Sequence, residues 1–120
     1  MKPHIDSTSF GSITIGGETY GHDVVIRPDG TVEKRRKKLS KEVYGTGHML
    51  SKEEARHVRG KSAGLVIIGT GQNGVLEISP EAFDYFSRKG CRVEALKTPD
   101  AVHRWNETDE DAVGLFHVTC

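Results

Sequence analysis

In the first third of the chain, residues 9–15 are expected to alternate as a β-strand, with Phe10, Ile13 and Ile15 as the apolar members, and Val24-Val25-Ile26 is a continuous apolar run that suits a buried strand. Two turn signals divide this stretch. Gly16-Gly17 suits a tight hairpin, and in Pro28-Asp29-Gly30 the proline fixes φ while the glycine accepts a positive φ. The pattern therefore predicts strands over residues 9–15, 20–27 and 31–35.

In the second half, apolar segments alternate with helix-start signals, which are Ser51-Lys52-Glu53-Glu54 (a capping box), Ser79-Pro80-Glu81 and Thr98-Pro99-Asp100. Residues 39–50 are expected to form a polar connection. Strands are expected over residues 65–68, 91–96 and 112–119. The run Leu65-Val66-Ile67-Ile68 is so apolar that we expect a central strand buried on both faces.

This order of elements predicts an α/β sandwich around one mixed sheet, with N-terminal hairpins appended. The chain has 120 residues, which is the size of one domain, and we treat 1–120 as a single domain. Lys and Arg together number 17, as do Asp and Glu, so no overall charge points to nucleic acid or a membrane. The N-terminus lacks an apolar leader, and we expect a cytoplasmic protein.

The two cysteines, Cys91 and Cys120, do not form a disulfide framework, although a single bridge between them stays open. The basic run Lys34 to Lys41 has no interleaved aromatic residues. It favours a solvated surface or a protein contact over nucleic acid.

A glycine-rich loop, Gly69-Thr70-Gly71-Gln72-Asn73-Gly74, follows the most apolar strand. Its spacing resembles a dinucleotide fingerprint, but five residues separate it from the next helix start, so we expect no nucleotide cofactor. The N–H groups of Gly69 to Gly71 are instead expected to face outward beside the helix start at Thr98-Pro99. Free N–H groups next to a helix N-terminus would form a weak site for a small anion.

None of the six histidines has the spacing of a metal site, and no serine or cysteine lies in a recognisable nucleophile motif. We therefore assign no metal ligands and no catalytic residues, and whether the chain is an enzyme stays open. His117 is expected at the edge of the core or of a pocket, and Asp23 could orient a histidine or a turn.

Several segments together resemble the Mth938-domain family, also called DUF498. They are Ser9-Phe10-Gly11-Ser12-Ile13, Tyr20 with Asp23-Val24, Gly69-Thr70-Gly71-Gln72, Thr98-Pro99, Asn106 and Leu115-Phe116-His117-Val118-Thr119-Cys120. The resemblance implies a compact three-layer α/β domain with a mixed central sheet and no established activity. The shared positions, joined by Thr70 of the loop, are candidates for one pocket: Asp23, Gly69, Thr70, Gly71, Gln72, Thr98, Asn106 and His117.

The family includes a mitochondrial assembly factor for respiratory complex I and a cytoplasmic protein linked to fat-cell differentiation. No Arg-rich segment precedes Phe10, which argues against the mitochondrial role. Two hypotheses remain. The first is a protein-interaction or assembly factor, with a homodimer left open. The alternative is a small-molecule or anion-binding protein, with or without enzyme activity, that uses loop 69–74.

Overall fold

The computed structural model describes residues 2–61 and 64–120, which form four helices and ten strands. In chain order these are β1 (Ile5–Ser9), β2 (Ser12–Ile15), β3 (Glu18–Tyr20), β4 (Val24–Ile26), β5 (Val32–Lys34), α1 (Lys38–Tyr44), β6 (Met49–Leu50), α2 (Lys52–Arg59), β7 (Leu65–Thr70), β8 (Glu77–Ile78), α3 (Pro80–Arg88), β9 (Arg92–Leu96), α4 (Thr98–Glu107) and β10 (Ala112–His117). The longest helix, α4, has 10 residues. No helix in these two ranges has the length and apolarity needed to cross a membrane.

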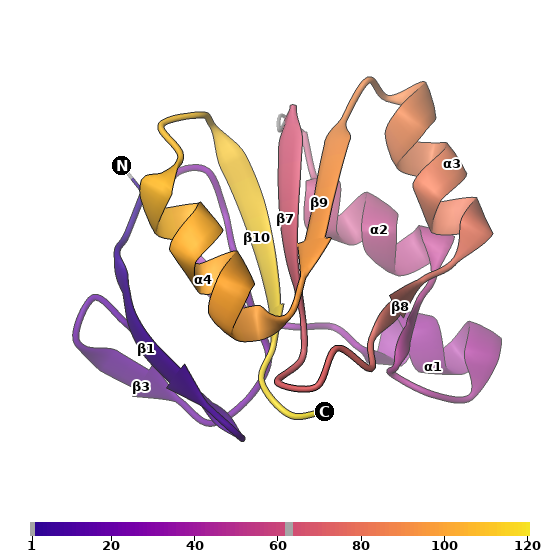
Figure 1. Cartoon of the computed structure of the whole chain (residues 1–120). Coiled ribbons are helices and arrows are strands. Elements are labelled where there is room, and N and C mark those ends of the chain that lie inside the picture. Colours follow the sequence, from indigo (N-terminus) through magenta and orange to yellow (C-terminus); the bar gives the residue numbers. More distant parts are fainter. Residues whose placement is uncertain (1, 62–63) are drawn as a thin grey trace.

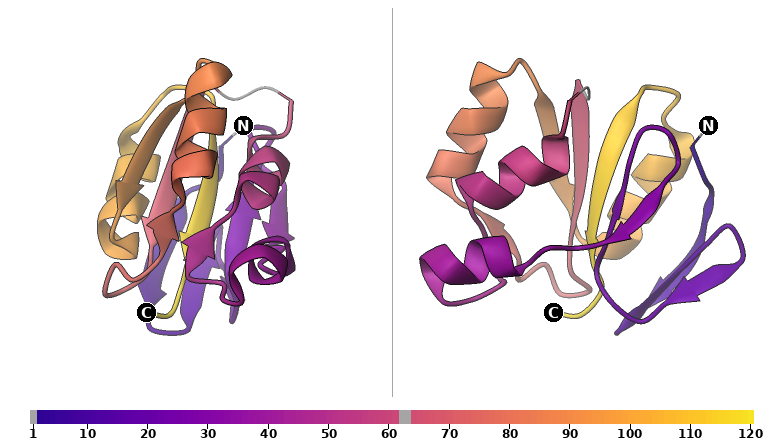
Figure 2. Two further views of the ribbon diagram at one scale, coloured as in Figure 1. Left: turned by 90° about the vertical axis from the view of Figure 1, so that its right-hand side faces the viewer. Right: turned by 180° about the vertical axis from the view of Figure 1, so that it is seen from behind.

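The central sheet has five strands in the order β5-β4-β10-β7-β9. Strand β10 is parallel to β7, and β7 to β9, whereas β10 and β4 are antiparallel, as are β4 and β5. The sheet is therefore mixed, and its pairing changes from parallel to antiparallel at β10. Helices α1, α2 and α3 lie on one side of it, and α4 with the antiparallel sheet β1-β2-β3 lies on the other (Figure 1 and Figure 2). This confirms the three-layer α/β class expected from the sequence.

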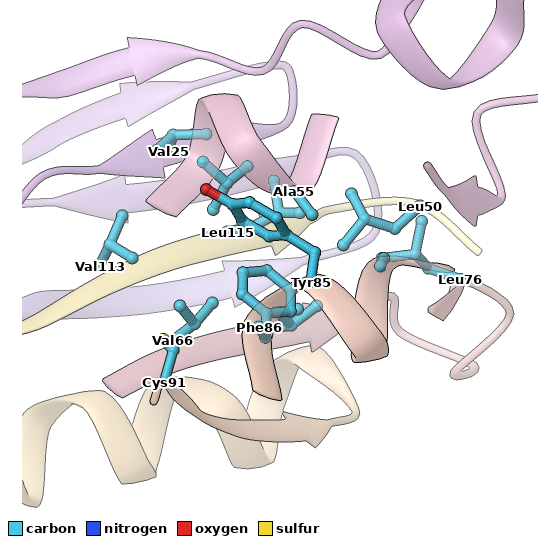
Figure 3. Packing of buried hydrophobic residues seen from close by; sticks show 13 residues of the cluster. Val25, Leu50, Ala55, Val66, Leu76, Tyr85, Phe86, Cys91, Val113 and Leu115 are labelled. Carbon is cyan, nitrogen blue, oxygen red and sulfur yellow. The ribbon is translucent and has the colours of Figure 1, made fainter. Parts of the chain in front are cut away.

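Strands β7 and β10, two of the three interior strands, supply side chains to both faces of the sheet. On one face, Val66 and Leu115 pack in a cluster with Phe86 and Tyr85 of α3 and with Ala55 of α2. Figure 3 shows the aromatic side chains of α3 reaching toward these strands. Burial on both faces explains why these segments read as continuous apolar runs.

On the opposite face, Ile67 and Phe116 pack against Trp105 of α4 and Ile13 of β2. The rings of Trp105 and Phe116 meet edge to face, with centroids 5.9 Å apart. The expected strand at 65–68 is thus confirmed as buried on both faces, although the middle strand of the five is β10.

The strand expectations for the first third were only partly correct. Residues 9–15 do not form one strand, because the chain reverses at Phe10-Gly11, where Gly11 has φ of +88°. Residues 20–27 also divide, and the two parts, β3 and β4, belong to different sheets. The sequence marked both breaks, because Phe10 and Ile13 are three positions apart and the polar run Gly21-His22-Asp23 precedes Val24. The expected turn at Gly16-Gly17 is confirmed between β2 and β3.

The helix starts at Ser51 and Ser79 are confirmed, because their hydroxyls accept the N–H groups of Glu54 and Ala82. Thr98 is different, since its side chain caps no helix. The expectation of a mere connection over 39–50 was wrong, because α1 and β6 occupy most of it.

Gly114 of β10 offers a test of this packing. A Cβ atom there would lie 2.5 Å from Cε2 of Phe116 and 3.0 Å from Cζ3 of Trp105. We expect Gly114→Ala to lower the free energy of unfolding by about 1–3 kcal/mol, because overpacking forces large rings out of place. Urea denaturation measures this. Gly21→Ala is the control, since its nearest new contact is at 4.0 Å, and equal stability of the two variants would contradict the packing.

Candidate functional site

Asp23 and His117 meet where β4 and β10 lie side by side. The antiparallel register pairs Val24 with Phe116, so the residue before β4 and the last residue of β10 become neighbours. His117 Nδ1 lies 2.7 Å from Asp23 Oδ2, and the Val118 N–H donates to the other carboxylate oxygen at 2.8 Å. The His117 residue is only 5% exposed.

Asp23 remains ionised in this setting. Burial alone would raise its pKa, but hydrogen bonds from His117, from the Val118 N–H and from Arg35 outweigh burial and lower the pKa to about 2. A carboxylate only accepts hydrogen bonds, so His117 Nδ1 must carry the proton that points at Asp23. In the neutral ring, Nε2 is then the unprotonated nitrogen.

Arg35 holds Asp23 from the other side. Its guanidinium, 1% exposed, donates to Asp23 Oδ2 at 3.0 Å and to both carboxylate oxygens of Glu54 at 2.7 and 3.0 Å. It also donates to the Gly47 carbonyl at 2.8 Å. The two carboxylates raise the pKa of Arg35 against the lowering effect of burial. Arg35 is therefore always charged, and its guanidinium holds Asp23, Glu54 and the Gly47 carbonyl.

The capping box expected at Ser51–Glu54 is only half present. Ser51 caps α2, but the Glu54 side chain, fully buried, binds Arg35 and the Ser40 hydroxyl instead of returning to the Ser51 N–H. The Ser51 N–H donates to Ser40 Oγ at 2.9 Å. Glu54 thus joins α1 and α2 to Arg35, the residue directly after β5.

A pocket of about 340 Å³ opens beside His117, at the carboxyl end of β10. We call it the basic pocket, and its lining is Lys37, Lys41, Gly45, Thr46, Gly47, His48, His117 and Thr119. No carboxylate belongs to this lining in the described part of the chain. The position agrees with the rule that open α/β sheets bind ligands beyond the carboxyl ends of strands, where the pairing changes.

The groups in the basic pocket are held from several directions. The rings of His48 and His117 meet edge to face at 5.4 Å. Gly47 lies against the aliphatic stems of Lys37 and Lys41, because a Cβ atom there would be 3.5 to 3.7 Å from their carbons. Since Arg35 binds the Gly47 carbonyl, the buried ion network also sets the position of this wall.

The glycine loop is close by, but its N–H groups do not face outward. Gly71 N–H donates to Thr98 Oγ1 at 2.9 Å, and Gln72 N–H donates to the Thr119 carbonyl at 2.7 Å. Asn73 N–H donates to the main-chain oxygen of Cys120 at 2.9 Å. The expectation of outward-facing donors was therefore wrong, because Thr98 accepts the Gly71 N–H and the C-terminal segment accepts those of Gln72 and Asn73. The loop supports the segment that carries Thr119.

The other expected site residues do not lie in one place. Gly69 packs against Thr98, whose hydroxyl donates to the His117 carbonyl at 2.5 Å. Thr70 Oγ1 donates to the Leu96 carbonyl at 3.0 Å. Asn106 lies outside the pocket, where its amide binds the N–H and carbonyl of Ile5, both at 2.9 Å, and joins α4 to β1.

The structure thus brings Asp23 and His117 into contact and places His117 in the pocket lining, with Gly69, Gly71 and Thr98 behind it. Sequence analysis missed the residues Arg35, Lys37, Lys41, Thr46, His48, Glu54 and Thr119. One signal in the sequence indicated the role of Arg35. Counting outward from the turn at 28–30 pairs Val24 with Lys34 and therefore places Asp23 opposite Arg35, an opposite-charge pair across a hairpin.

Other hollows lie elsewhere, including one of about 410 Å³ along residues 34–39. Another, of about 390 Å³, lies between α2 and α3, and one of about 520 Å³ lies between β1 and α4. The ion pairs beside the hollow between α2 and α3, such as Arg88 with Asp84, are exposed. Within residues 2–61 and 64–120, no cluster of three or more His, Cys, Asp or Glu side chains could hold a metal ion. The basic pocket is the hollow lined by His117, whose ring binds the ionised Asp23 carboxylate behind it.

These features define a class of protein: a three-layer α/β domain in which a buried Asp–Arg–Glu network supports a histidine at the edge of a mixed sheet. A family profile described as "Protein of unknown function (DUF498/DUF598)" matches residues 5–115. The chain therefore belongs to the DUF498 family, the Mth938-like proteins, and the family resemblance noted in the sequence is confirmed.

Solved structures agree with this assignment. The conserved hypothetical protein PH1505 from Pyrococcus horikoshii OT3 is similar over 100% of both chains, with 32% identity and a TM-score of 0.90. A structure named MT938 is similar over 99% of this chain and 100% of its own, with 31% identity and a TM-score of 0.85. A Mth938-like domain from Bordetella pertussis has 16% identity and a TM-score of 0.65 over 97% of this chain and 85% of its own, and shows the fold alone.

The lowered pKa of Asp23 predicts how stability depends on pH. The folded value is about 2 and the ordinary value is 3.8, so the unfolded chain binds the extra proton between these values. Asp23 then contributes about 2 kcal/mol that is fully present above the ordinary value and is lost as pH falls through the folded value. We expect Asp23→Asn to remove this part of the acid sensitivity. Urea denaturation across that range measures it.

The control is Asp111→Asn, which removes an exposed carboxylate. It should keep the acid sensitivity of the wild type. Identical pH dependence in the wild type and in Asp23→Asn would contradict the assignment of an ionised, hydrogen-bonded Asp23.

Proposed function

We propose that this protein binds a small organic anion, through a carboxylate or phosphate group, in the basic pocket. The single observation that supports it most is the His117 ring, fixed by Asp23 at 2.7 Å and lining the same hollow as two lysines and His48. Lysine ammonium and imidazole groups are the usual partners of such anions. This keeps the anion-binding alternative from the sequence but moves it from the glycine loop to the other side of His117.

The size of the hollow supports an organic ligand. Ligand pockets span about 300–1,000 Å³, and about 340 Å³ leaves room for atoms beyond the charged group. The loop 45–48 and the C-terminal segment supply small and hydroxyl-bearing residues, Gly45, Thr46 and Thr119, which can contact such atoms.

The test is a titration with succinate and with inorganic phosphate, followed by ¹H–¹⁵N NMR. We expect shift changes centred on residues 45–48 and 117–119. The double variant Lys37→Gln/Lys41→Gln should weaken binding by at least about tenfold, because each lost charge-assisted hydrogen bond contributes about 1.5–3 kcal/mol. The matched control is Lys52→Gln/Lys89→Gln, which removes the same charge from the hollow between α2 and α3.

The control should bind like the wild type. The proposal is wrong if neither anion shifts the pocket residues, or if both double variants lose affinity equally, since the second result would reflect general charge alone.

A second candidate function is protein binding, and the exposed apolar side chains of α1 and α3 favour it. Val43 is 57% exposed and Phe83 is 49% exposed, and the Tyr44 hydroxyl donates to Glu81 Oε1 at 3.3 Å, so these helices lie close together. Exposed apolar surface of this kind is typical of interaction sites. We infer that another protein covers this side of the molecule, and a second copy of the chain is the partner that can be tested directly.

Sedimentation velocity over a range of concentrations tests this. We expect the wild type to self-associate and Val43→Ser/Phe83→Ser to remain monomeric while retaining its thermal stability, because both side chains are exposed. Phe10→Ser, at the exposed turn between β1 and β2, is the control and should associate like the wild type. A wild-type chain that stays monomeric throughout would rule out the homodimer.

A further inference from the structure

Thr119, His117 and Asp23 form a continuous line of hydrogen-bonding groups that starts in the lining of the basic pocket and ends at Asp23 behind it. Thr119 Oγ1 lies 3.3 Å from His117 Nε2, and His117 Nδ1 lies 2.7 Å from Asp23 Oδ2. A hydroxyl, an imidazole and a carboxylate in this order are the components of a nucleophile activated by a general base. Both Thr119 and His117 line the pocket.

The direction of each hydrogen bond follows from the chemistry of Asp23. Because its carboxylate only accepts, the His117 proton is on Nδ1, and Nε2 is free to accept. The Thr119 hydroxyl then donates to Nε2. A proton can therefore leave the hydroxyl toward the imidazole, which is the direction that nucleophilic attack by the hydroxyl oxygen requires.

The three groups are held in place independently of one another. Asp23 is fixed by Arg35 and by the Val118 N–H, at 3.0 and 2.8 Å. The Thr119 carbonyl accepts the Gln72 N–H at 2.7 Å, so the glycine loop supports the residue from behind. His117 Cδ2 would lie 2.8 Å from a Cβ atom at position 71, and only glycine leaves room for the ring there.

We propose that Thr119 is a nucleophile, activated by His117 with Asp23 as a positioning residue, and that the basic pocket catalyses acyl transfer from esters with an anionic acyl group. The inference rests on the proposed function, because Lys37 and Lys41 select the negative charge of the substrate. The lysine ammonium groups and His48 are also the cations available to stabilise the oxyanion that forms on the carbonyl oxygen.

The reaction balances with water as the co-reactant. Thr119 Oγ forms a bond to the ester carbonyl carbon while its proton passes to His117 Nε2. The bond between that carbon and the alcohol oxygen then breaks, and the leaving alcohol takes the proton from His117. Water attacks the acyl-Thr119 carbon with His117 as base, and Thr119 Oγ recovers the proton as it leaves. The net products are a carboxylic acid and an alcohol.

The test uses mono-4-nitrophenyl succinate as the probe and 4-nitrophenyl acetate as its uncharged counterpart. Release of 4-nitrophenolate measures acylation, and mass spectrometry of digested protein locates the succinyl group. We expect the wild type to prefer the anionic ester and to carry the group on Thr119. Thr119→Val should lower the acylation rate on the order of 100-fold, the contribution typical of general acid–base catalysis, and Thr119→Ser should retain most of it.

Thr14→Val is the matched control, since Thr14 is a half-buried threonine whose hydroxyl contacts Thr19 in the sheet β1-β2-β3, away from the pocket. It should react like the wild type. The inference is overturned if Thr119→Val reacts as fast as the wild type, or if the succinyl group is found on Lys37 or Lys41 alone.

The two proposals can fail separately. If succinate shifts the NMR signals of the pocket but no acylation depends on Thr119, anion binding stands and the catalytic role is wrong. If succinate does not bind in the pocket, the proposed function itself is wrong. Competitive inhibition of acylation by succinate supports both.

Discussion

The architecture of the site depends on the ion pairs and hydrogen bonds made by the buried guanidinium of Arg35. This guanidinium is 1% exposed and holds Asp23, Glu54 and the Gly47 carbonyl, three groups from separate parts of the chain. A buried charge without its partner costs several kcal/mol, so these contacts are formed together or not at all. One side chain thereby joins the β4–β5 hairpin to α2 and to the loop before β6.

The functional geometry follows from this network. The Asp23 carboxylate accepts hydrogen bonds from Arg35, the Val118 N–H and His117. These hydrogen bonds keep Asp23 ionised and fix the His117 tautomer. Glu54 uses its oxygens on Arg35 and Ser40, which holds α1, the helix that carries Lys41, against α2. Arg35 is shared by two carboxylates, Asp23 and Glu54, and Lys37 and Lys41 face the basic pocket outside these ion pairs.

The glycine loop supports the pocket instead of forming it. Its N–H groups are satisfied by the C-terminal segment, and Gly71, at φ of +110°, leaves the space that the His117 ring fills. The relative PH1505, at 32% identity, shares the fold over the full chain. A glycine-rich turn after a buried strand is thus a structural requirement of this pocket, as well as a familiar signature of phosphate loops.

The sequence by itself determined the layers, the buried strand at 65–68, most of the strand expected at 112–119, the serine-capped helices and the choice of Asp23 and His117 as pocket candidates. The strands and helices depend on local periodicity and capping, which act over short distances along the chain, whereas the choice of Asp23 and His117 came from the family resemblance. Tertiary structure decided the rest. Arg35 appeared as one cation in a solvated run and Glu54 as part of a cap, because nothing local shows that each lies opposite the other's charge. The roles of Lys37, His48 and Thr119 depend on long-range register, which brings residues dozens of positions apart within contact distance and which no local pattern encodes.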